Sequence, residues 1–165
     1  LAELRELTRG ALAEMRTLLM ELRPDALAEA NLQDLLRHLT NAFIARTRIP
    51  TSLLIDGDSV PPVDVKIAFY RIAQEALNNI ARHTDPERVT LSLVSEPGQT
   101  ELALVDDGQG FDLRQAPGAD HHGLRIMHER AEEVGADLEI TSQIGKGTCI
   151  HLRWADDRYR SLSSD

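Results

Sequence analysis

One stretch decides the fold of this chain: Leu102-Ala103-Leu104-Val105-Asp106-Asp107-Gly108-Gln109-Gly110-Phe111. Four apolar residues are followed at once by two carboxylates and two glycines. An apolar run that ends in Asp and Gly is typical of a buried strand that opens into a loop. The carboxylates would then lie at the mouth of a core, where they can accept hydrogen bonds from a ligand that glycines let the backbone approach. An ordinary strand-to-turn junction explains the pattern equally well, because Asp-Gly is a common turn pair.

The segments around this stretch predict a sheet of five strands. Each segment alternates apolar and polar residues or is an apolar run bounded by turn residues. Short turns join the last four segments in two pairs, so two antiparallel hairpins are expected. The predicted strands are residues 52–55, 88–95, 100–105, 138–142 and 148–154.

Helical periodicity predicts three helices between or before these strands, at residues 31–48, 63–83 and 124–134. Asn31 is expected to cap the first of them, and Gly135 to close the last. Residues 111–122 lack periodicity and include Pro117 and Gly118, so they are expected to form a mobile loop. The order of elements indicates an α+β sandwich with helices on one face of a sheet.

The first 22 residues predict a further helix. Leucines and other apolar residues recur there in alternating steps of three and four, which is an a/d stripe. Such a helix packs on other helices, either across a dimer or against its own domain. Pro24 is expected to end it. The chain begins at Leu1 rather than at Met, so we expect it to be a piece of a longer protein.

The composition limits the class of protein. The 165 residues are 42% hydrophobic and 27% charged, as in soluble globular proteins. The 27 acidic residues against 18 basic ones give a net charge of -9. This charge disfavours nucleic acid and anionic membranes as main partners, because phosphate recognition needs clustered Lys and Arg. Cys149 is the only cysteine, so a reducing, cytoplasmic compartment is expected. No apolar stretch approaches the ~20 residues of a membrane span.

The long helix at residues 63–83 carries an unusual set of polar residues. Glu75, Asn79 and His83 follow one another at steps of four and therefore share one face. An Asn side chain offers a neutral oxygen to Mg²⁺, which prefers oxygen ligands and keeps waters and phosphates around it. Arg82 and His83 could then meet those phosphates. The alternative is a solvated helix face with a hydrogen bond between neighbouring turns.

Glycines gather in the second half of the chain, where seven of the ten lie between Gly108 and Gly147. Glycine-rich loops let backbone amides approach an anion. His122-Gly123-Leu124 is expected to open a helix, and a helix N-terminus binds anions readily. The sequence contains no phosphate-binding G-x-x-x-x-G-K-[ST] loop, no G-x-G-x-x-G dinucleotide motif, no paired Cys or His metal motif and no G-x-S-x-G nucleophile motif.

Four motifs follow one another in a recognisable order: Q-E-A-L-N-N-I-A-R-H at 74–83, D-D-G-Q-G-F at 106–111, H-H-G-L-R-I-M-H-E-R-A at 121–131 and G-K-G-T at 145–148. Together they resemble the ATP-binding catalytic domain of sensor histidine kinases, in the GHKL superfamily. They look most like the nitrate-sensor-type subfamily of two-component kinases, where H-G-L-x-x-M-x-E-R-A is typical. The resemblance covers about residues 30–155.

The resemblance implies a fold and a division of the chain. The fold is a Bergerat-type two-layer α/β sandwich, with a mixed, largely antiparallel sheet and helices on one face. Residues 1–27, which contain L-L-x-E-L-R-P, resemble the C-terminal helix of the dimerisation and phosphoacceptor region with its linker. Residues 28–156 would be the ATP-binding catalytic domain, and residues 157–165 a frayed tail.

The resemblance also implies roles for the residues of the long helix. Asn79 matches the family's Mg²⁺-binding asparagine. Glu75 matches the acid that orients water in related ATPases, and in a kinase it would support Mg²⁺ and phosphate. Arg82 and His83 match positions that reach phosphate or ribose. These four residues are the predicted catalytic set.

The other motifs imply the nucleotide contacts. Asp106 matches the aspartate that accepts from the adenine amino group, and Gly108 and Gly110 would give adenine room. Residues 111–122 match the ATP lid, and Thr148 matches a hydroxyl near adenine. The end of the lid, where backbone amides meet phosphates, matches His122, Gly123 and Leu124.

Three departures from the family pattern matter. Asp107 stands where many relatives have Asn, which adds negative charge near the nucleotide. His121 stands where a second glycine box would begin, which implies a less flexible lid. The phosphoacceptor histidine is missing: of the six histidines, only His128 is followed by an acid, and it lies in the lid-helix motif. We therefore expect this chain not to phosphorylate itself.

The implied function is that of a two-component signalling kinase. The domain would bind ATP and Mg²⁺ and transfer the γ-phosphoryl group to a histidine outside this chain, for relay to an aspartate of a response regulator. The full-length protein would be a homodimer, and the domain would lie in the cytoplasm whether or not the protein is membrane-anchored. Neither nucleic acid nor membrane would contact this fragment.

Two alternatives stay open. A GHKL-type ATPase would use Glu75 as a general base and would release phosphate without an acceptor. A non-catalytic module would bind nucleotide or only dimerise, with residues 1–22 as its active surface.

Overall fold

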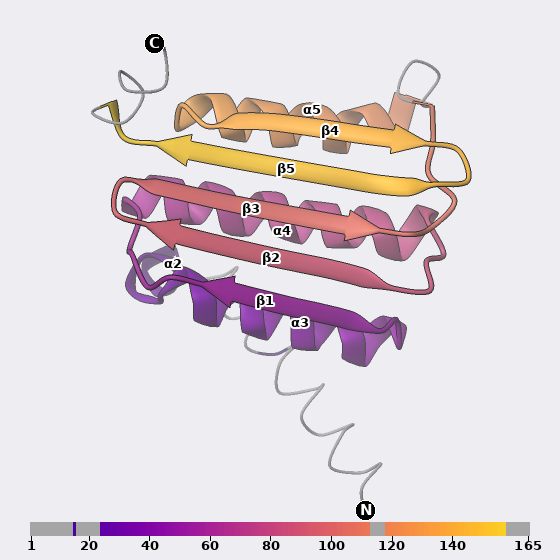
Figure 1. Cartoon of the computed structure of the whole chain (residues 1–165), viewed down its shortest axis with the longest axis horizontal. Helices are drawn as coiled ribbons and strands as arrows, with labels where there is room; N and C mark the ends of the chain where they lie inside the picture. The colour runs from indigo at the N-terminus through magenta and orange to yellow at the C-terminus, as the bar shows by residue number, and fades with distance from the viewer. Residues whose placement is uncertain (1–14, 16–23, 113–117, 158–165) are drawn as a thin grey trace, which may run out of the picture.

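The computed structural model describes residues 15, 24–112 and 118–157 of the chain. A five-stranded mixed sheet forms one layer, and the helices cover one of its faces (Figure 1). The helices are α2 (Pro24–Glu29), α3 (Leu32–Thr47), α4 (Val63–His83) and α5 (Gly118–Glu133). The strands are β1 (Thr51–Asp56), β2 (Val89–Glu96), β3 (Gln99–Asp106), β4 (Asp137–Gln143) and β5 (Gly147–Ala155). The predicted α+β sandwich is confirmed.

The sheet has the order β1-β2-β3-β5-β4. β1 and β2 pair in parallel and are connected through α4, whereas every other pairing is antiparallel. β2–β3 and β4–β5 are the two predicted hairpins. The register of β3 with β5 sets Asp106 opposite Thr148 at one end of the sheet. These two residues come from separate motifs and meet because of this pairing.

Local signals fix the ends of α3 as predicted. The Asn31 side chain accepts a hydrogen bond from the Asp34 amide at 2.7 Å, which satisfies one of the free donors of the first turn. Arg48 ends the helix in the left-handed conformation, with φ of 63°, and its amide donates to Ile44 O at 2.8 Å. α4 follows Pro61-Pro62 and spans the predicted residues 63–83.

The core lies between the sheet and the helices. Its largest fully buried side chains come from α3, α4, β2 and β3: Tyr70, Phe43, Phe69, Leu32, Leu35, Leu36, Ile72, Leu77, Leu91, Leu93, Leu102 and Leu104. Because α4 contacts both β3 and β5, its C-terminal half lies near Asp106 and Thr148 at one end of the sheet. This packing creates the space described below.

α5 corrects one prediction. The helix begins at Gly118 rather than at Leu124, so the last five residues of the predicted loop 111–122 are helical. His122 and Gly123 therefore lie inside the helix and not at its N-terminus, and their contact with phosphates stays a prediction. Gly123 indicates a close contact instead, because a Cβ at this position would lie 2.6 Å from Glu75 Oε1 on α4.

α2 is joined to the core through a buried lysine. Lys66 on α4 is 4% exposed, and its ammonium donates to Ala28 O at 2.6 Å and to Ala30 O at 2.8 Å. These carbonyls lie at the C-terminal end of α2, where the last carbonyls of a helix lack helical partners. Leu27, 2% exposed, packs in the same core. The segment before α3 is therefore part of the packed unit.

The predicted N-terminal helix lies outside the described residues, except for Met15, which is helical and exposed. The predicted frayed tail also lies outside them after Asp157. In the parts of the chain that the structure describes, no helix is both long enough and apolar enough to cross a membrane.

Candidate functional site

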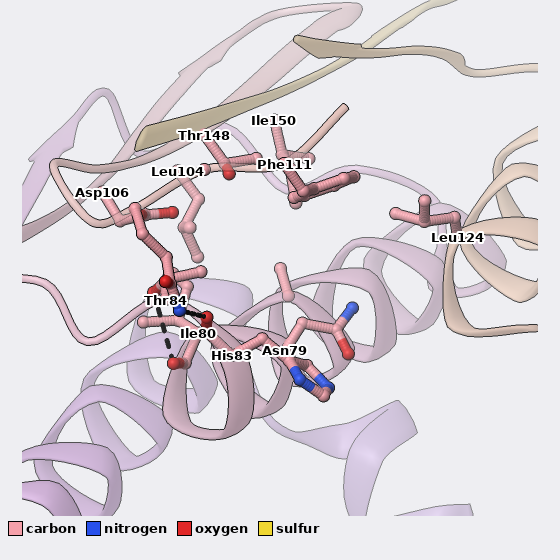
Figure 2. Close-up of a pocket in the computed structure, with 13 residues that line it drawn as sticks. Asn79, Ile80, His83, Thr84, Leu104, Asp106, Phe111, Leu124, Thr148 and Ile150 are labelled. Carbon is pink, nitrogen blue, oxygen red and sulfur yellow. Dashed lines mark hydrogen bonds between the residues drawn. The ribbon is translucent and has the colours of Figure 1, made fainter. Parts of the chain in front are cut away.

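A pocket of about 230 Å³ opens between the C-terminal half of α4 and the adjoining ends of β3 and β5. Figure 2 shows its two sides, with Asp106, Leu104, Thr148 and Ile150 from the sheet facing Asn79, Ile80 and His83 from α4. The full lining is Ala76, Asn79, Ile80, His83, Thr84, Leu104, Asp106, Gln109, Gly110, Phe111, Leu124, Thr148 and Ile150. Apolar walls therefore enclose a small number of polar groups.

Asp106 presents an unused acceptor in this pocket. The residue is 2% exposed, and its Oδ1 accepts a hydrogen bond from the Gly108 amide at 2.9 Å. Oδ2 is buried and has no hydrogen-bond partner among the described residues. Buried polar atoms in folded proteins almost always have a partner, so an unpaired carboxylate oxygen that lines a pocket favours a ligand with an N–H or O–H donor.

Burial raises the pKa of Asp106 above the ordinary value of 3.8, because a charged carboxylate loses water there. The Gly108 amide and the Thr84 hydroxyl oppose this rise, the negative charge of Asp107 adds to it, and the Thr148 amide opposes it. Thr84 Oγ1 itself donates to Ile80 O at 3.3 Å, which leaves Oδ2 without a direct bond. A donor from a ligand would therefore relieve an unfavourable burial.

Asp107 has a different role from its neighbour. Its Oδ1 accepts from the Arg88 amide at 2.9 Å, and the residue is exposed and does not line the pocket. This hydrogen bond ties the end of β3 to the start of β2. Its charge acts on the site only from a distance, by raising the pKa of Asp106.

The glycines of this loop are needed by the protein's own backbone. A Cβ on Gly108 would lie 2.2 Å from Thr84 O, and a Cβ on Gly110 would lie 2.1 Å from Gln143 O. Gly110 also has φ of 57°, which favours glycine. Of the two, only Gly110 lines the pocket. A side chain at either position would thus clash with backbone, and the room that these glycines give to adenine stays a prediction.

The predicted residues of α4 divide into two pairs. Asn79 and His83 line the pocket, and their side chains lie together at its open side in Figure 2. Glu75 and Arg82 do not line it. Glu75 lies against Gly123 of α5, as the 2.6 Å position of a Cβ there shows, and Arg82 is exposed on another side of α4.

The predicted residues of α5 also separate. Leu124 closes one end of the pocket, but His122 and Gly123 do not line it. His122 is exposed, and its Nδ1 lies 3.3 Å from Arg125 Nη2. The structure thus brings together six predicted residues: Asn79, His83, Asp106, Gly110, Leu124 and Thr148.

Phe111 of the predicted lid also lines the pocket, and the sequence did not predict the other six lining residues: Ala76, Ile80, Thr84, Leu104, Gln109 and Ile150. Leu104 and Ile150 are register partners on β3 and β5, two positions before and after the Asp106–Thr148 pair. Alternation along each strand could have placed both on the helix-facing side. Thr84 carried no signal, because its role depends on the turn that follows α4.

The Asp106 Oδ2 acceptor and the apolar walls of the pocket suit a flat heterocycle with an amine at the Asp106 end. Among the described residues, no group of three or more His, Cys, Asp and Glu side chains could hold a metal ion. A cation at this site would therefore need ligand oxygens from a bound anion, with the Asn79 amide oxygen as the protein's contribution. The residues fit a nucleotide with its cation better than a metal alone.

Comparison with known proteins defines the class. The fold is a two-layer α/β sandwich, and a family model described as "Histidine kinase-, DNA gyrase B-, and HSP90-like ATPase" matches residues 64–158. The chain belongs to this family.

Several sensor kinases are similar in sequence. The sensor histidine kinase LiaS of Bacillus subtilis is 38% identical over 141 residues, which are 85% of this chain and 38% of LiaS. The sensor protein VraS of Staphylococcus haemolyticus is 32% identical over 141 residues, which are 85% of this chain and 40% of VraS. The chain thus spans about two fifths of the length of these relatives.

Solved structures agree on the fold. The histidine kinase domain of the Erythrobacter litoralis EL346 blue-light activated histidine kinase matches 97% of this chain and 79% of its own, with a TM-score of 0.62 and 24% identity. The mycobacterial sensor histidine kinase MprB matches 76% of this chain and 95% of its own, with a TM-score of 0.58 and 21% identity.

Proposed function

We propose that residues 28–156 are the ATP-binding catalytic domain of a two-component sensor histidine kinase. The observation that carries this proposal is the buried, unpartnered Asp106 Oδ2 at the inner end of a pocket in a chain of this ATPase family. An adenine amino group is a donor of the right kind for that oxygen. The similarity to LiaS and VraS favours a kinase over other members of the family.

The pocket supports a division of labour along the nucleotide. Asp106 accepts from the adenine amine, and Leu104, Ile80 and Ile150 supply the apolar walls of the base site. Asn79 and His83, at the open side, lie where the ribose and phosphates would emerge. Asn79 would hold Mg²⁺ through its amide oxygen, and the cation would neutralise charge on the phosphates.

Four further residues belong to the proposal through the family's motifs. Glu75 would support the cation and phosphates, and Arg82 would reach phosphate. The backbone of Gly123 and the neighbouring His122 would meet the phosphates, and residues 111–122 would form the ATP lid. Glu75 lies against Gly123 in this structure, so the two motifs are in direct contact.

The reaction is transfer of a phosphoryl group. The bond from the γ-phosphorus to the β–γ bridging oxygen breaks, a bond from that phosphorus to a nitrogen of a histidine outside this chain forms, and ADP leaves. Such a transfer depends mainly on positioning and charge neutralisation. The phosphoryl group would then pass to an aspartate of a response regulator.

The larger setting is proposed on the same grounds. Residues 1–27 would end the dimerisation and phosphoacceptor region of a homodimeric protein, with the catalytic domain in the cytoplasm and residues 157–165 as a tail. The H-G-L-R-I-M-H-E-R-A motif favours the nitrate-sensor-type subfamily, which stays a prediction.

Calorimetry with ATP and MgCl₂ tests the proposal. The parent chain and Asp107→Asn are expected to bind ATP with similar affinity, because Asp107 does not line the pocket. Asp106→Asn is expected to lose at least tenfold in affinity, since its amide offers a donor where the amine needs an acceptor. If Asp106→Asn binds ATP as tightly as the parent, the base site is assigned to the wrong residue.

A further inference from the structure

Ser142 is a polar residue on the inward face of an edge strand. The inward positions of β4 are Leu138, Ile140 and Ser142, each half-buried, whereas the alternate positions are exposed. The first two pack against the apolar core, so a third apolar residue would continue the pattern. Ser142 does not line the pocket itself. Its hydroxyl instead reaches three groups around it.

The three contacts of Ser142 Oγ join the lid segment to the base site. The Phe111 amide donates to Oγ at 2.9 Å. Thr148 Oγ1 lies 2.9 Å away, with either hydroxyl able to donate. Oγ donates to Gly147 O at 3.2 Å. Phe111 and Thr148 both line the pocket.

Counting protons decides the direction of the ambiguous contact. A serine hydroxyl has one proton and two acceptor sites. The Phe111 amide can only donate, and the Gly147 carbonyl can only accept. Ser142 therefore makes all three hydrogen bonds only if its proton goes to Gly147 O and the Thr148 proton comes to Ser142 Oγ. Every other assignment loses one of the three bonds.

This assignment leaves Thr148 Oγ1 with acceptor capacity alone toward the pocket. Thr148 is the register partner of Asp106, whose unpartnered Oδ2 is also an acceptor. We infer that Ser142 is a specificity-determining positioning residue, which orients the Thr148 hydroxyl so that the base site presents two adjacent acceptors. The inference rests on the proposed function, because it assumes that a purine nucleotide occupies this pocket.

Two adjacent acceptors discriminate between purines. An amine at the 6-position has two N–H donors and tolerates both acceptors. A 6-carbonyl is itself an acceptor and would face Thr148 Oγ1 without a proton between them. Inosine triphosphate is the sharpest probe, because it replaces the adenine amine by a carbonyl and its ring N–H can still donate to Asp106.

The experiment compares Kd for ATP and for inosine triphosphate, each with MgCl₂, by calorimetry on the whole 165-residue chain. In Ser142→Ala the Thr148 hydroxyl is free to rotate and donate to the 6-carbonyl. The ratio of Kd for inosine triphosphate to Kd for ATP is expected to fall by about fivefold, the factor that corresponds to one hydrogen bond. Thr141→Ala, the exposed neighbour on β4, is the matched control and is expected to keep the parent's ratio.

A double-mutant cycle separates this role from the support that Ser142 gives to Phe111. In a Thr148→Val background, Ser142→Ala is expected to leave the ratio unchanged, because no hydroxyl remains to be oriented. Should Ser142→Ala fail to fold, Ser142→Thr and Ser142→Val provide the same comparison at nearly equal volume, with only Thr keeping the parent's ratio.

The outcomes distinguish the two proposals. If the parent binds neither nucleotide, the proposed function fails. If the parent binds ATP but Ser142→Ala changes both affinities by the same factor, Ser142 has only a structural role and this inference is overturned, while the proposed function stands.

Discussion

The burial of Asp106 lowers the stability of the fold, although its carboxylate is the proposed acceptor for the nucleotide base. Burial raises its pKa, so the folded state favours the protonated acid more than the unfolded state does. The stability that this group contributes is therefore complete below its ordinary pKa of 3.8 and is lost as pH rises through the raised value. Above the raised pKa the ionised carboxylate destabilises the fold.

The substitution Asp106→Asn should therefore raise the melting temperature at pH 7 while it weakens ATP binding at least tenfold. The increase should disappear below pH 3.8, where the parent's carboxyl is neutral. Thermal unfolding followed by circular dichroism at both pH values measures this. Asp107→Asn is the control and should not gain stability, because it exchanges the charged acceptor of the Arg88 amide for a neutral one. A lower melting temperature for Asp106→Asn at pH 7 would contradict this account.

Substitution by alanine should have opposite effects on the free energy of unfolding at two glycines close to the site. A Cβ on Gly108 would lie 2.2 Å from the Thr84 carbonyl oxygen, which is backbone and cannot move cheaply. A Cβ on Gly123 would lie 2.6 Å from Glu75 Oε1, the far end of a flexible side chain. Gly123 also lies inside a helix, where alanine is favoured by roughly 1 kcal/mol.

Urea unfolding of the two variants tests this contrast. Gly108→Ala is expected to lose about 2 kcal/mol or more, in the range of overpacking substitutions. Gly123→Ala is expected to keep or slightly increase the free energy of unfolding, with Glu75 rotated away. A loss in Gly123→Ala that Glu75→Ala fails to restore would mean that backbone, rather than the Glu75 side chain, limits the approach of α5 to α4.

At the scale of elements, α2 depends on one charged group. The Lys66 ammonium donates to Ala28 O and Ala30 O, and both carbonyls would lose this partner in Lys66→Met. Hydrogen bonds from charged donors contribute roughly 1.5–3 kcal/mol, so we expect Lys66→Met to lower the free energy of unfolding by about 2–3 kcal/mol. Hydrogen exchange should also show faster exchange in α2.

The chain supplies its own control for this prediction. Lys146, the only other lysine, is exposed in the turn between β4 and β5. Lys146→Met should change the free energy of unfolding by no more than about 0.5 kcal/mol, as is usual for surface positions. Equal losses in the two variants would show that charge, not the contacts of Lys66 with α2, accounts for the effect.

The sequence predicted those elements whose signals are local. Asn31 caps α3 and the alternation of β2 and β3 follows the predicted strands, because caps and pleats act over a few residues. The start of α5 was missed because Gly123 looked like a helix boundary, whereas it marks a contact with α4. The apolar walls of the pocket and the Ser142 bonds were missed because they arise only when β3, β5 and β4 are paired.

At the scale of the whole molecule, the helices on one face of the sheet leave α4 and the β3–β5 pair to form the pocket together. A ligand in that pocket bridges elements from both layers and so binds the folded state alone. ATP at 100 times its Kd should therefore stabilise the fold by about 2.7 kcal/mol. A thermal shift titration with MgCl₂ should show an ATP-dependent rise in the parent and in Asp107→Asn, and a smaller rise in Asp106→Asn at the same ATP concentration.

The fate of the γ-phosphate decides between a kinase and an ATPase of the same family. An ATPase would use Glu75 as a general base toward water, which requires its carboxylate to face the phosphates. In this structure Glu75 lies against Gly123 and does not line the pocket, so either role at the phosphates requires its side chain to turn away from Gly123. Because the proposed kinase transfers its phosphoryl group to a histidine outside this chain and not to water, we expect the isolated chain to bind ATP but to release less than one phosphate per chain over a time in which an active ATPase turns over many times.

A continuous phosphate-release assay with the parent chain and Glu75→Gln measures this. A slow release that Glu75→Gln leaves unchanged agrees with a kinase domain whose acceptor histidine is elsewhere. Steady turnover that Glu75→Gln abolishes would instead assign the chain to the ATPases, and Glu75 would then have to leave Gly123 during the reaction.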